Sequence, residues 1–295
     1  MVTVRDWQDA DTDWWVEQRR RWDPTMSVVR LRLIASGAVG RFVTRRVAVE
    51  NDVRLGVGLV VEPTIQGYST NVIVDPRARS QGVGSLLWRE VMDVVTDEPL
   101  FTFLPDRDER GIAISEHWGF RTVTHGIVSR IDLTGPLPQP NLPAGMTVRV
   151  IRASDPGAPD VGLGELIADT GDYPEAAAMG WKGTLAAFDA AFSDITWVLV
   201  EDGSTVAAAA SMSALAGPGG SEWAVVFTGT RSTYRGRGLS RVAKQTLHQL
   251  AARRGATGLS TTNEAGNTGI RALNASLGYR VMGGEVRMVR QVNVR

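Results

Sequence analysis

Two patterns of apolar and polar positions alternate along this chain, and each predicts a different kind of element. Short apolar runs between turn residues, such as 100–104 and 223–227, have the length and composition of buried strands. Longer stretches instead repeat their apolar residues at helical spacing. The clearest of these follows Gly238, with apolar residues at Leu239, Val242, Ala243, Leu247, Leu250 and Ala251. The chain alternates strands with helices, which predicts an α+β fold built on a mixed sheet.

The first 133 residues contain enough elements for a domain. In chain order, the pattern predicts a helix over 9–21, strands over 41–51, 53–61 and 68–74, a helix from Val83 to Val95, a strand over 100–104, a helix over 108–117 and a strand from Gly119 to Leu133. Asn51-Asp52 lies between the first two strands and is a strong hairpin signal. Because 295 residues are more than one core needs, we expect this half to form a domain of its own.

A proline-rich segment over 134–145 separates this half from the rest. Its four prolines exclude a helix interior and a central strand, so we expect a stiff, extended linker. The same order of elements then recurs as a strand over 146–151, helices near 160–168 and 182–192, strands over 197–201 and 206–214 around Asp202-Gly203, the strand and helix on either side of Gly238, a strand over 258–262, a helix over 268–277 and final strands from Gly278-Tyr279. The expected domains are therefore 1–133 and 146–295.

Two landmarks indicate that the halves are copies of one fold. Arg79-Ser80-Gln81-Gly82-Val83-Gly84 aligns with Arg235-Gly236-Arg237-Gly238-Leu239-Ser240, 156 residues later. Gly119-Phe120 aligns with Gly278-Tyr279, 159 residues later. Because two unrelated landmarks keep nearly the same spacing, the chain is predicted to be a tandem repeat.

Composition narrows the classes of function. The formal net charge is +0, which gives no bulk attraction to nucleic acid or to an acidic membrane surface. The absence of cysteine excludes disulfides, thiolate nucleophiles and thiolate metal sites. The three histidines, His117, His125 and His248, have no ligand spacing, so no metal site is expected. With neither a signal peptide nor an apolar run of membrane length, the chain is expected to be soluble and cytoplasmic.

The strongest candidate for chemistry is the turn between the strand over 223–227 and the helix that follows it. A strand that enters a glycine-rich turn and leaves it as a helix places several unpaired backbone N–H groups around one point. Together with the positive end of the helix dipole, these groups form a site for a phosphate. Gly236 and Gly238 let the backbone approach such a ligand closely, because neither has a Cβ atom.

Both copies of this turn resemble the motif of the GCN5-related N-acetyltransferase (GNAT) family, Arg/Gln-x-x-Gly-x-Gly/Ala. The first copy matches it as Arg79-x-x-Gly82-x-Gly84 and the second as Arg235-x-x-Gly238-x-Ser240, with serine at the last small position. The segment from Asn263 to Tyr279 is also similar to the family's asparagine-rich fourth helix and its closing glycine-aromatic pair. The resemblance covers nearly the whole chain and implies two tandem GNAT folds, a layout similar to that of mycothiol synthase.

The resemblance implies that the chain uses acetyl-CoA as a co-substrate. In that family the turn holds the pyrophosphate, and the pantetheine arm lies where the fourth strand diverges from the fifth at a bulge. The residues that this assigns to acetyl-CoA are Thr228, Gly229, Thr230, Arg235, Gly236, Arg237, Gly238, Leu239, Ser240 and Asn267 in the second copy, and Val72, Ile73, Val74, Arg79, Ser80, Gln81, Gly82, Val83 and Gly84 in the first. An acceptor amine then attacks the thioester directly, while the protein aligns the reactants and removes a proton.

The resemblance favours the second copy as the catalytic one. A general base in this family often lies on the fourth strand, where this copy has Glu222, expected to act through water, and the first copy has Gln66-Gly67-Tyr68. Exposed carboxylates are common at strand ends, so a purely structural role for Glu222 stays open. Many members place a tyrosine acid four residues before the closing glycine, where this chain has Asn274 and Ser115.

The general acid is therefore unassigned. Asn274 can hydrogen-bond the cofactor, but an amide is no acid near neutral pH. Water or another tyrosine, namely Tyr173, Tyr234 or Tyr279, is the alternative source of the proton. Around the helix over 268–277, we expect Asn263 to act as a cap and Asn267 to contact the cofactor.

The acceptor side is expected near 169–175. Its three carboxylates, Asp169, Asp172 and Glu175, either attract a cationic amine or belong to a solvated loop. The predicted function is acetyl transfer from acetyl-CoA to a primary amine of a small molecule or peptide, within 146–295. Two alternatives stay open: a non-catalytic acyl-CoA-binding or scaffold protein, and catalysis in the first copy. No nucleic acid or membrane partner is expected, and the acceptor, the acyl chain and the oligomeric state are left open.

Overall fold

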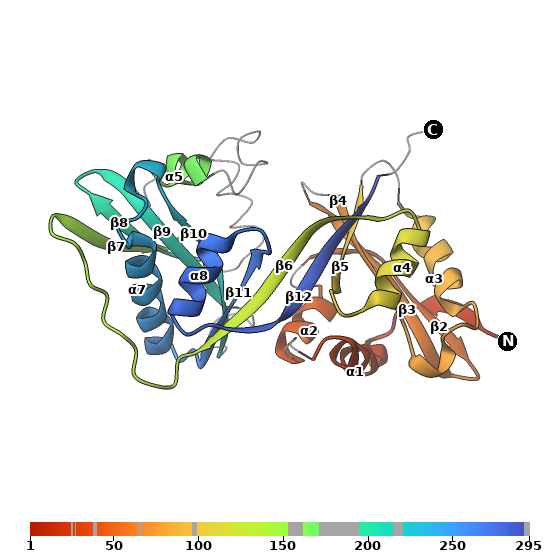
Figure 1. The fold of residues 1–295 in the computed structure, drawn as a ribbon. Helices are drawn as coiled ribbons and strands as arrows, with labels where there is room; N and C mark the ends of the chain where they lie inside the picture. Colours follow the sequence, from red (N-terminus) through yellow and green to blue (C-terminus); the bar gives the residue numbers. More distant parts are fainter. Residues whose placement is uncertain are drawn as a thin grey trace. The chain divides into compact units, whose positions relative to one another are not determined.

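A computed structural model describes residues 1–24, 26, 28–37, 40–64, 67–95, 99–152, 162–170, 195–214 and 221–291. The chain divides into two compact units, of which unit 1 comprises Met1–Ile127 with Gly283–Arg295 and unit 2 comprises Val128–Met282 (Figure 1). Each unit combines strands of a mixed sheet with helices, which confirms the predicted α+β class. Among the helices in the described ranges, none is long and apolar enough to cross a membrane.

The sheet of unit 1 has the strand order β1-β2-β3-β4-β5-β12. Its strands are β1 (Thr3–Asp6), β2 (Phe42–Glu50), β3 (Val53–Thr64), β4 (Gly67–Val74), β5 (Leu100–Pro105) and β12 (Arg280–Arg290). β4 and β5 run parallel, whereas β5 and β12 run antiparallel. The predicted hairpin at Asn51-Asp52 is confirmed. Both residues have positive φ, 48° and 63°, as a two-residue turn between twisted strands requires.

Helices cover both faces of this sheet, because successive strand residues point to opposite sides. The four helices are α1 (Thr12–Trp22), α2 (Val28–Ala35), α3 (Val83–Met92) and α4 (Glu109–His117). Val47 belongs to the core under α1 and α2, and its neighbour Ala48 belongs to the core under α3. α2 was not predicted, because its alternating apolar and polar residues lack a clear helical period. Leu31 and Ala35, four residues apart, are both buried and fix the helix by tertiary packing.

Unit 2 repeats this architecture. Its strand order is β6-β11-β10-β9-β8-β7. The strands are β6 (Arg121–Asp132), β7 (Met146–Arg152), β8 (Thr196–Asp202), β9 (Thr205–Ala214), β10 (Glu222–Thr230) and β11 (Gly258–Glu264). β10 and β11 run parallel, and the predicted β8–β9 hairpin is confirmed, with Gly203 at φ 57° in its turn.

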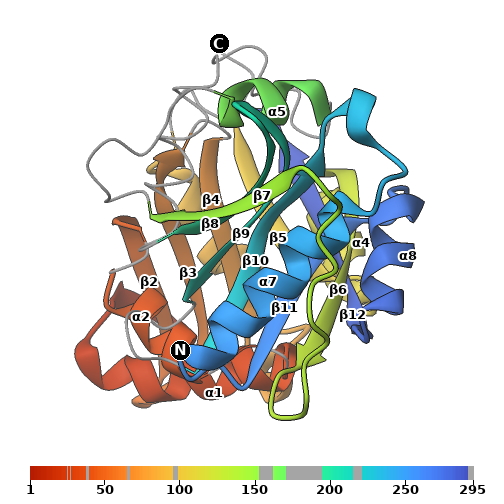
Figure 2. The same cartoon turned by 90° about the vertical axis from the view of Figure 1, so that its left-hand side faces the viewer.

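The helices of unit 2 are α5 (Leu163–Thr170), α7 (Leu239–Arg253) and α8 (Thr268–Ser276). α7 lies across the strands β8 to β11 (Figure 2). It packs on Val198 and Val200, while α5 packs on Trp197 and Leu199, so the two helices cover opposite faces. The helix predicted over 182–192 falls outside the described residues.

The chain ends in unit 1 rather than in the second copy. Gly283 to Arg290 of β12 belongs to unit 1, where Glu285 pairs with Pro105 and Arg290 pairs with Leu100. β6 begins in unit 1 and ends in unit 2. The compact units therefore differ from the expected domains 1–133 and 146–295. The periodicity of a strand defines its two faces but does not define which sheet it joins.

The proline-rich segment over 134–145 has neither helix nor strand, as predicted. It connects β6 to β7 within unit 2 rather than linking the two units. The Pro138 carbonyl accepts a hydrogen bond from Gln249 of α7 at 3.1 Å, and Leu137 packs against the core under α7. The segment is therefore held against α7 at Leu137 and Pro138.

Candidate functional site

The glycine-rich turn of unit 2 connects β10 to α7 through a short 3-10 helix, Ser232–Tyr234. Gly236 and Gly238 have φ of 79° and 76°, a left-handed conformation that other residues adopt at a cost. A Cβ added at either position meets no protein atom within 4 Å. The two glycines are therefore required by the conformation of the turn, and the space beside them is open.

Five consecutive backbone N–H groups of this turn are available. Arg235 donates its N–H to the Ser232 carbonyl at 3.3 Å, and Arg241 donates to the Gly238 carbonyl at 3.0 Å. Between them, the N–H groups of 236–240 have no acceptor within the described ranges. The 15-residue helix α7 begins at the same place, so its positive end adds to the field of these groups. This arrangement suits an anion such as a pyrophosphate.

β10 leaves its neighbour β11 shortly before the turn. The two strands pair from Glu222 with Gly258 to Ala224 with Ser260, and the described pairing ends there. On its other side, β10 shifts register against β9 between Val225 and Phe227, so Val226 forms a bulge. The bulge and the divergence occur within two residues of each other and open the sheet beside Thr228–Thr230.

The turn of unit 1 has backbone N–H groups without acceptors like those of unit 2, but the strand that precedes it, β4, has no bulge between Ser69 and Val74. Gly82 has φ 81°, and the N–H groups of 80–84 have no acceptor in the described part of the chain. Ser80 occupies the left-handed position that Gly236 fills in unit 2, with φ 62°. β4 pairs with β5 only at Tyr68 and Ser69, yet it keeps an unbroken register with β3 from Ser69 to Val74. Unit 1 therefore has the divergence without the bulge.

One arginine contact is the same in both turns. Arg235 approaches the carbonyl of Thr230 at 3.5 Å, and Arg79 approaches the carbonyl of Val74 at 3.4 Å. Each arginine folds back on the last residue of the preceding strand. This repeated contact supports the 156-residue alignment of the two copies.

The opposite face of β10 is covered by the end of α5. A Cβ on Gly229 would lie 2.6 Å from the Phe227 ring and 2.7 Å from Thr170, so glycine is needed for this close packing. Asp169 accepts hydrogen bonds from the backbone N–H and the hydroxyl of Ser232, and the backbone N–H bond is the main cause that lowers the pKa of its carboxyl. Asp169 thus fastens the turn to α5. Asp172 and Glu175 of the predicted acceptor region lie outside the described residues.

Glu222, the predicted base, begins β10 and is half-buried. It lies four residues before the bulge at Val226, which is roughly 13 Å along a strand. This separation exceeds the reach of one bridging water, so a contact between its carboxylate and a group bound at the bulge needs a chain of waters. Its catalytic role stays a prediction.

The cap of α8 is Asn267 and not Asn263. Asn267 is the N-cap of α8, and its side chain accepts the N–H of Ile270 at 3.3 Å. Asn263 lies in β11 and accepts from Asn274 at 2.7 Å, so the prediction that Asn263 is the cap was wrong. Both residues lie close to the start of the helix in the sequence, and asparagine is a preferred cap at either position. The cofactor contact expected of Asn267 stays a prediction.

Asn274 belongs to a buried polar cluster that the sequence analysis did not single out. Its Oδ1 accepts from the Lys244 ammonium at 2.5 Å, and that ammonium also lies 4.6 Å from the centre of the Tyr279 ring. The Tyr279 hydroxyl lies 2.9 Å from Nε2 of His248. The one signal in the sequence was a lysine on the apolar face of α7, between Ala243 and Leu247.

Burial changes the protonation of this cluster. It lowers the pKa of Lys244 from 10.5 to about 7 and raises that of Tyr279. Burial, together with the nearby Lys244 charge, lowers the pKa of His248 from 6.5 to about 3, so this histidine is neutral at physiological pH. Among the described residues there is no group of metal-binding side chains.

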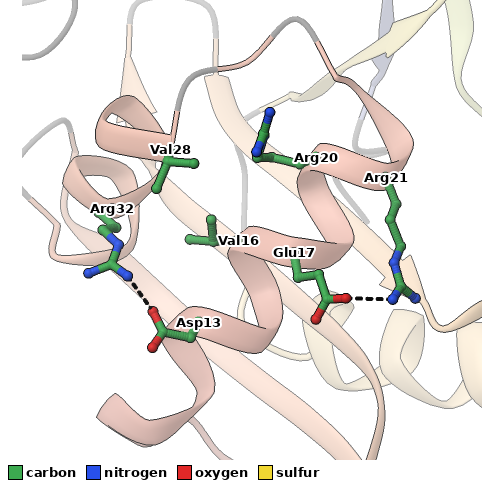
Figure 3. Close-up of a pocket in the computed structure, with 7 residues that line it drawn as sticks. All are labelled: Asp13, Val16, Glu17, Arg20, Arg21, Val28 and Arg32. Carbon is green, nitrogen blue, oxygen red and sulfur yellow. Dashed lines mark hydrogen bonds and ion pairs between the residues drawn. The ribbon is translucent and has the colours of Figure 1, made fainter.

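A surface pocket of about 510 Å³ lies elsewhere, on α1 and α2 of unit 1 (Figure 3). Ion pairs between Arg32 and Asp13 and between Arg21 and Glu17 occupy its lining. No residue of either glycine-rich turn lines it. The pocket is therefore separate from the predicted site.

Comparison with known proteins identifies the fold through structure alone. No protein-family model matches the sequence, and no curated protein is similar to it. A GCN5-related N-acetyltransferase from Sphaerobacter thermophilus is similar in structure, with a TM-score of 0.74, 18% identity, and coverage of 98% of this chain and 95% of that one. A tandem GNAT protein from the clavulanic acid biosynthesis pathway, whose structure was determined without acetyl-CoA, has a TM-score of 0.69 and 15% identity over 100% of both chains.

A third similar structure is a GCN5-related glucosamine N-acetyltransferase region within a fungal multi-domain β-N-acetylglucosaminidase. Its TM-score is 0.67 at 13% identity, over 98% of this chain and 38% of that one. These likenesses confirm the fold expected from the two glycine-rich turns. Over nearly its whole length, the chain has the fold of the GCN5-related N-acetyltransferases, and it matches a tandem protein of that fold from end to end.

Proposed function

We propose that this protein transfers an acetyl group from acetyl-CoA to a primary amine of a small molecule or peptide, with its active site in unit 2. One observation carries the proposal. The bulge at Val226, the end of the β10–β11 pairing at Ala224 and the open N–H groups of 236–240 follow one another along a single strand and turn. Such a sequence offers an acyl-CoA a polar cradle for its pyrophosphate and a gap for its extended arm.

The backbone supplies most of the proposed binding. The N–H groups of 236–240 hold the pyrophosphate, and the backbone of Thr228–Thr230 bonds the pantetheine amides in place of the missing neighbour strand. Because main-chain donors and acceptors fix the arm along its length, the thioester is held at one depth in the sheet. The acceptor amine meets it there in a defined orientation, which is a large part of the catalytic effect.

The reaction needs a proton acceptor and an environment that tolerates negative charge. The amine attacks the thioester carbonyl carbon, the carbonyl oxygen becomes negative, and the carbon–sulfur bond then breaks to release the CoA thiolate. Glu222 is the proposed acceptor of the amine proton, through a chain of bridging waters along β10. The solvent is the proposed source of the proton that neutralises the thiolate.

Several of the similar structures support an amine acceptor. The fungal region is described as a glucosamine N-acetyltransferase, and the clavulanic acid pathway protein is described as a tandem GNAT protein. These names describe the two similar proteins, and the acceptor of this chain is inferred from them only by analogy. An amino sugar, a polyamine and an N-terminal peptide amine are therefore the first acceptors to test here.

A second candidate is a non-catalytic acyl-CoA-binding protein. Asn274 favours it, because this residue stands at the position of the acid in the resembling family and both ends of its amide already bind protein side chains. Such a protein binds acetyl-CoA tightly and releases no thiol with any amine.

The decisive measurement is the release of CoA thiol from acetyl-CoA in the presence of a panel of primary amines. Amine-dependent release supports the enzyme. Tight calorimetric binding of acetyl-CoA without release from any amine supports the binding protein instead.

Two matched variants then locate the activity. Gly238→Trp and Gly82→Trp place the same side chain at φ 76° and 81°, where an added Cβ meets no protein atom within 4 Å, and both are designed to fill the proposed pyrophosphate cradle. We expect Gly238→Trp to abolish release and Gly82→Trp to leave it. Activity that survives Gly238→Trp and disappears in Gly82→Trp assigns the chemistry to unit 1.

A further inference from the structure

The buried polar cluster of unit 2 has an apolar counterpart in unit 1. Lys244 is the sixth residue of α7, and Trp88 is the sixth residue of α3. Each unit also has a left-handed glycine, Gly278 or Gly119, before its closing aromatic residue. The equivalent pairs are Lys244 and Trp88, His248 and Met92, Asn263 and Leu104, Asn274 and Ser115, and Tyr279 and Phe120.

In unit 1 an uncharged side chain, Trp88, fills the position of Lys244, and the Arg290 guanidinium lies 5.4 Å from the centre of the Trp88 ring and donates to Sδ of Met92 at 3.0 Å. Trp88 stacks on Trp118 with the ring centres 4.7 Å apart and also contacts Phe120. In unit 2 the same place holds the Lys244 ammonium, which is 0% exposed and hydrogen-bonds an amide rather than a carboxylate. A buried charge without a counter-ion opposes folding, and apolar replacements are often as stable or more stable. Packing alone therefore gives no reason for Lys244.

The choice of lysine is also uncommon for this chain, which contains 30 arginines and only two lysines. An ammonium is a compact point charge that fits beside one amide oxygen, whereas a guanidinium needs partners for five donors. Lys244 directs its charge at a single acceptor, Oδ1 of Asn274.

The hydrogen bonds lead from Lys244 towards the proposed site. Lys244 donates to Asn274 at 2.5 Å, and Asn274 donates through Nδ2 to Oδ1 of Asn263 at 2.7 Å. Asn263 lies in β11, three residues beyond Ser260, the last β11 residue in the described pairing with β10. The Nδ2 group of Asn263 has no acceptor among the described residues. The chain of donors therefore ends on β11, the strand from which β10 diverges beyond Ala224.

We propose that Lys244 and Asn274 orient and polarise Asn263, and that the Asn263 amide donates a hydrogen bond to the thioester of acyl-CoA as negative charge develops on it. This inference rests on the proposed function. Each donor in a connected chain strengthens the next, and a cation at its head strengthens the whole chain. A donor held in place before the reaction stabilises developing charge without reorganisation.

The proposal adds no proton transfer to the reaction. The amine nitrogen bonds to the carbonyl carbon, the carbon–sulfur bond breaks, and the sulfur leaves with the electron pair as thiolate. The amine proton passes to the base and its water. Asn263 is the residue that contacts the substrate, and Lys244 and Asn274 are positioning residues.

Three variants of unit 2 test the chain of donors, and two of them introduce the residue found at the equivalent position of unit 1. Asn263→Leu removes the terminal donor. Lys244→Met keeps the shape of the side chain and, in assays at about pH 6, removes the charge that Lys244 carries below its pKa of about 7. We expect each to lower kcat about tenfold or more and to leave the KM for acetyl-CoA within about twofold, because the contact strengthens only during the reaction. His248→Met changes the same cluster outside the chain and should keep kcat within about twofold of wild type.

The double variant Lys244→Met/Asn263→Leu distinguishes a chain from two separate effects. If Lys244 acts through Asn263, the double variant should be no slower than Asn263→Leu. Losses that multiply overturn the proposal, because they mean that the two residues act separately. A wild-type kcat in Lys244→Met overturns it as well.

The two proposals fail in different ways. A wild-type protein that binds acetyl-CoA and releases no thiol with any amine overturns both the proposed function and this inference. An active wild type whose Lys244→Met and Asn263→Leu variants lose only KM, with kcat preserved, keeps the proposed function and overturns the role of Asn263.

Discussion

At the scale of single residues, Lys244 has the least ordinary environment in unit 2. Its ammonium is enclosed by α7, α8 and the Tyr279 ring, with the Asn274 amide as its hydrogen-bond acceptor. Water cannot compensate the charge, so the charged form is less stable in the folded protein than in the unfolded chain. The protonation of one side chain is therefore coupled to folding.

This coupling predicts how stability depends on pH. The pKa of Lys244 is about 7 when folded and 10.5 in the exposed reference state. Between these values the unfolded chain binds a proton that the folded protein has released, so the free energy of unfolding due to this group rises with pH. The increase is complete above 10.5, absent below 7, and about 5 kcal/mol at most. We expect Lys244→Met to lose this increase relative to wild type.

Nuclear magnetic resonance gives the direct measurement. Because the chain contains only two lysines, isotopic labelling of lysine yields two side-chain signals. Lys244→Met identifies the signal of Lys244, which should titrate near pH 7. A value near 10.5 in the folded protein contradicts the predicted environment and removes the expected pH dependence.

Glu222 gives a prediction about turnover instead of stability. A base on β10 matters most where the acceptor amine is still protonated, at low pH, and matters less where free amine is abundant. Glu222→Gln should therefore reduce turnover most at the acidic end of the range and leave acetyl-CoA affinity little changed. Glu62→Gln, an exposed carboxylate of unit 1, is the control. Rates equal to wild type at every pH exclude Glu222 from the mechanism.

The sequence predicted the residues of the turn but not those behind it. Gly236 and Gly238 were predictable because their positive φ restricts the choice of residue at those positions. Lys244 was not, since a lysine on a helix is normally exposed and only the packing of α8 over α7 encloses it. The start of α8 at Thr268 was predicted, but its cap was assigned to Asn263 instead of Asn267, because asparagine suits a cap equally well at either position.

At the scale of elements, the two units differ most in one strand. β10 contains a bulge at Val226, and β4 has none between Ser69 and Val74. A bulge adds one residue to a strand without changing the alternation of its side chains enough to mark the sequence. Both strands were predicted, but the difference that favours unit 2 as the active unit could only be found in the structure.

The two turns also predict effects of different size when the residue at their shared left-handed position is replaced. Ser80 and Gly236 occupy the same left-handed position, with φ of 62° and 79°. Gly236→Ala should lower the free energy of unfolding by about 1 kcal/mol, because a Cβ is disfavoured there. Ser80→Gly should change it by about 0.5 kcal/mol or less, because relief of strain is offset by the greater freedom of the unfolded chain.

Thermal unfolding of both variants provides the test, with Gly135→Ala as the control. Gly135 has no left-handed φ, and a Cβ there meets no protein atom within 4 Å, so its substitution should be neutral or slightly stabilising. A Gly236→Ala variant as stable as Gly135→Ala contradicts the conformation of the turn.

At the scale of the molecule, the tandem repeat was predictable from two spacings in the sequence. That β12 joins the sheet of unit 1 was not predictable. Arg79 and Gly119 have counterparts at nearly constant offsets, and such regularity is a property of sequence. Which sheet β12 joins depends on the edge strand with which it pairs, and that strand is β5. Val286 and Met288 have the alternation of any half-buried strand and fit either copy by pattern alone. Only their contacts with Leu100 and Phe120 assign them to unit 1.

That assignment makes the end of the chain a determinant of the stability of unit 1. Met288 is fully buried in the core formed by β5 and β12, so Met288→Ala should cost about 3 kcal/mol. Amide hydrogen exchange should lose protection in β5 and keep it in β8 and β9. Met212→Ala makes the same change in the core of unit 2 and should give the reverse pattern, whereas Met282→Ala changes an exposed residue of β12 and should affect neither unit. If Met288→Ala exposes β8 and β9 while β5 stays protected, β12 belongs to the sheet of the second copy, and the unit boundaries follow the repeat instead.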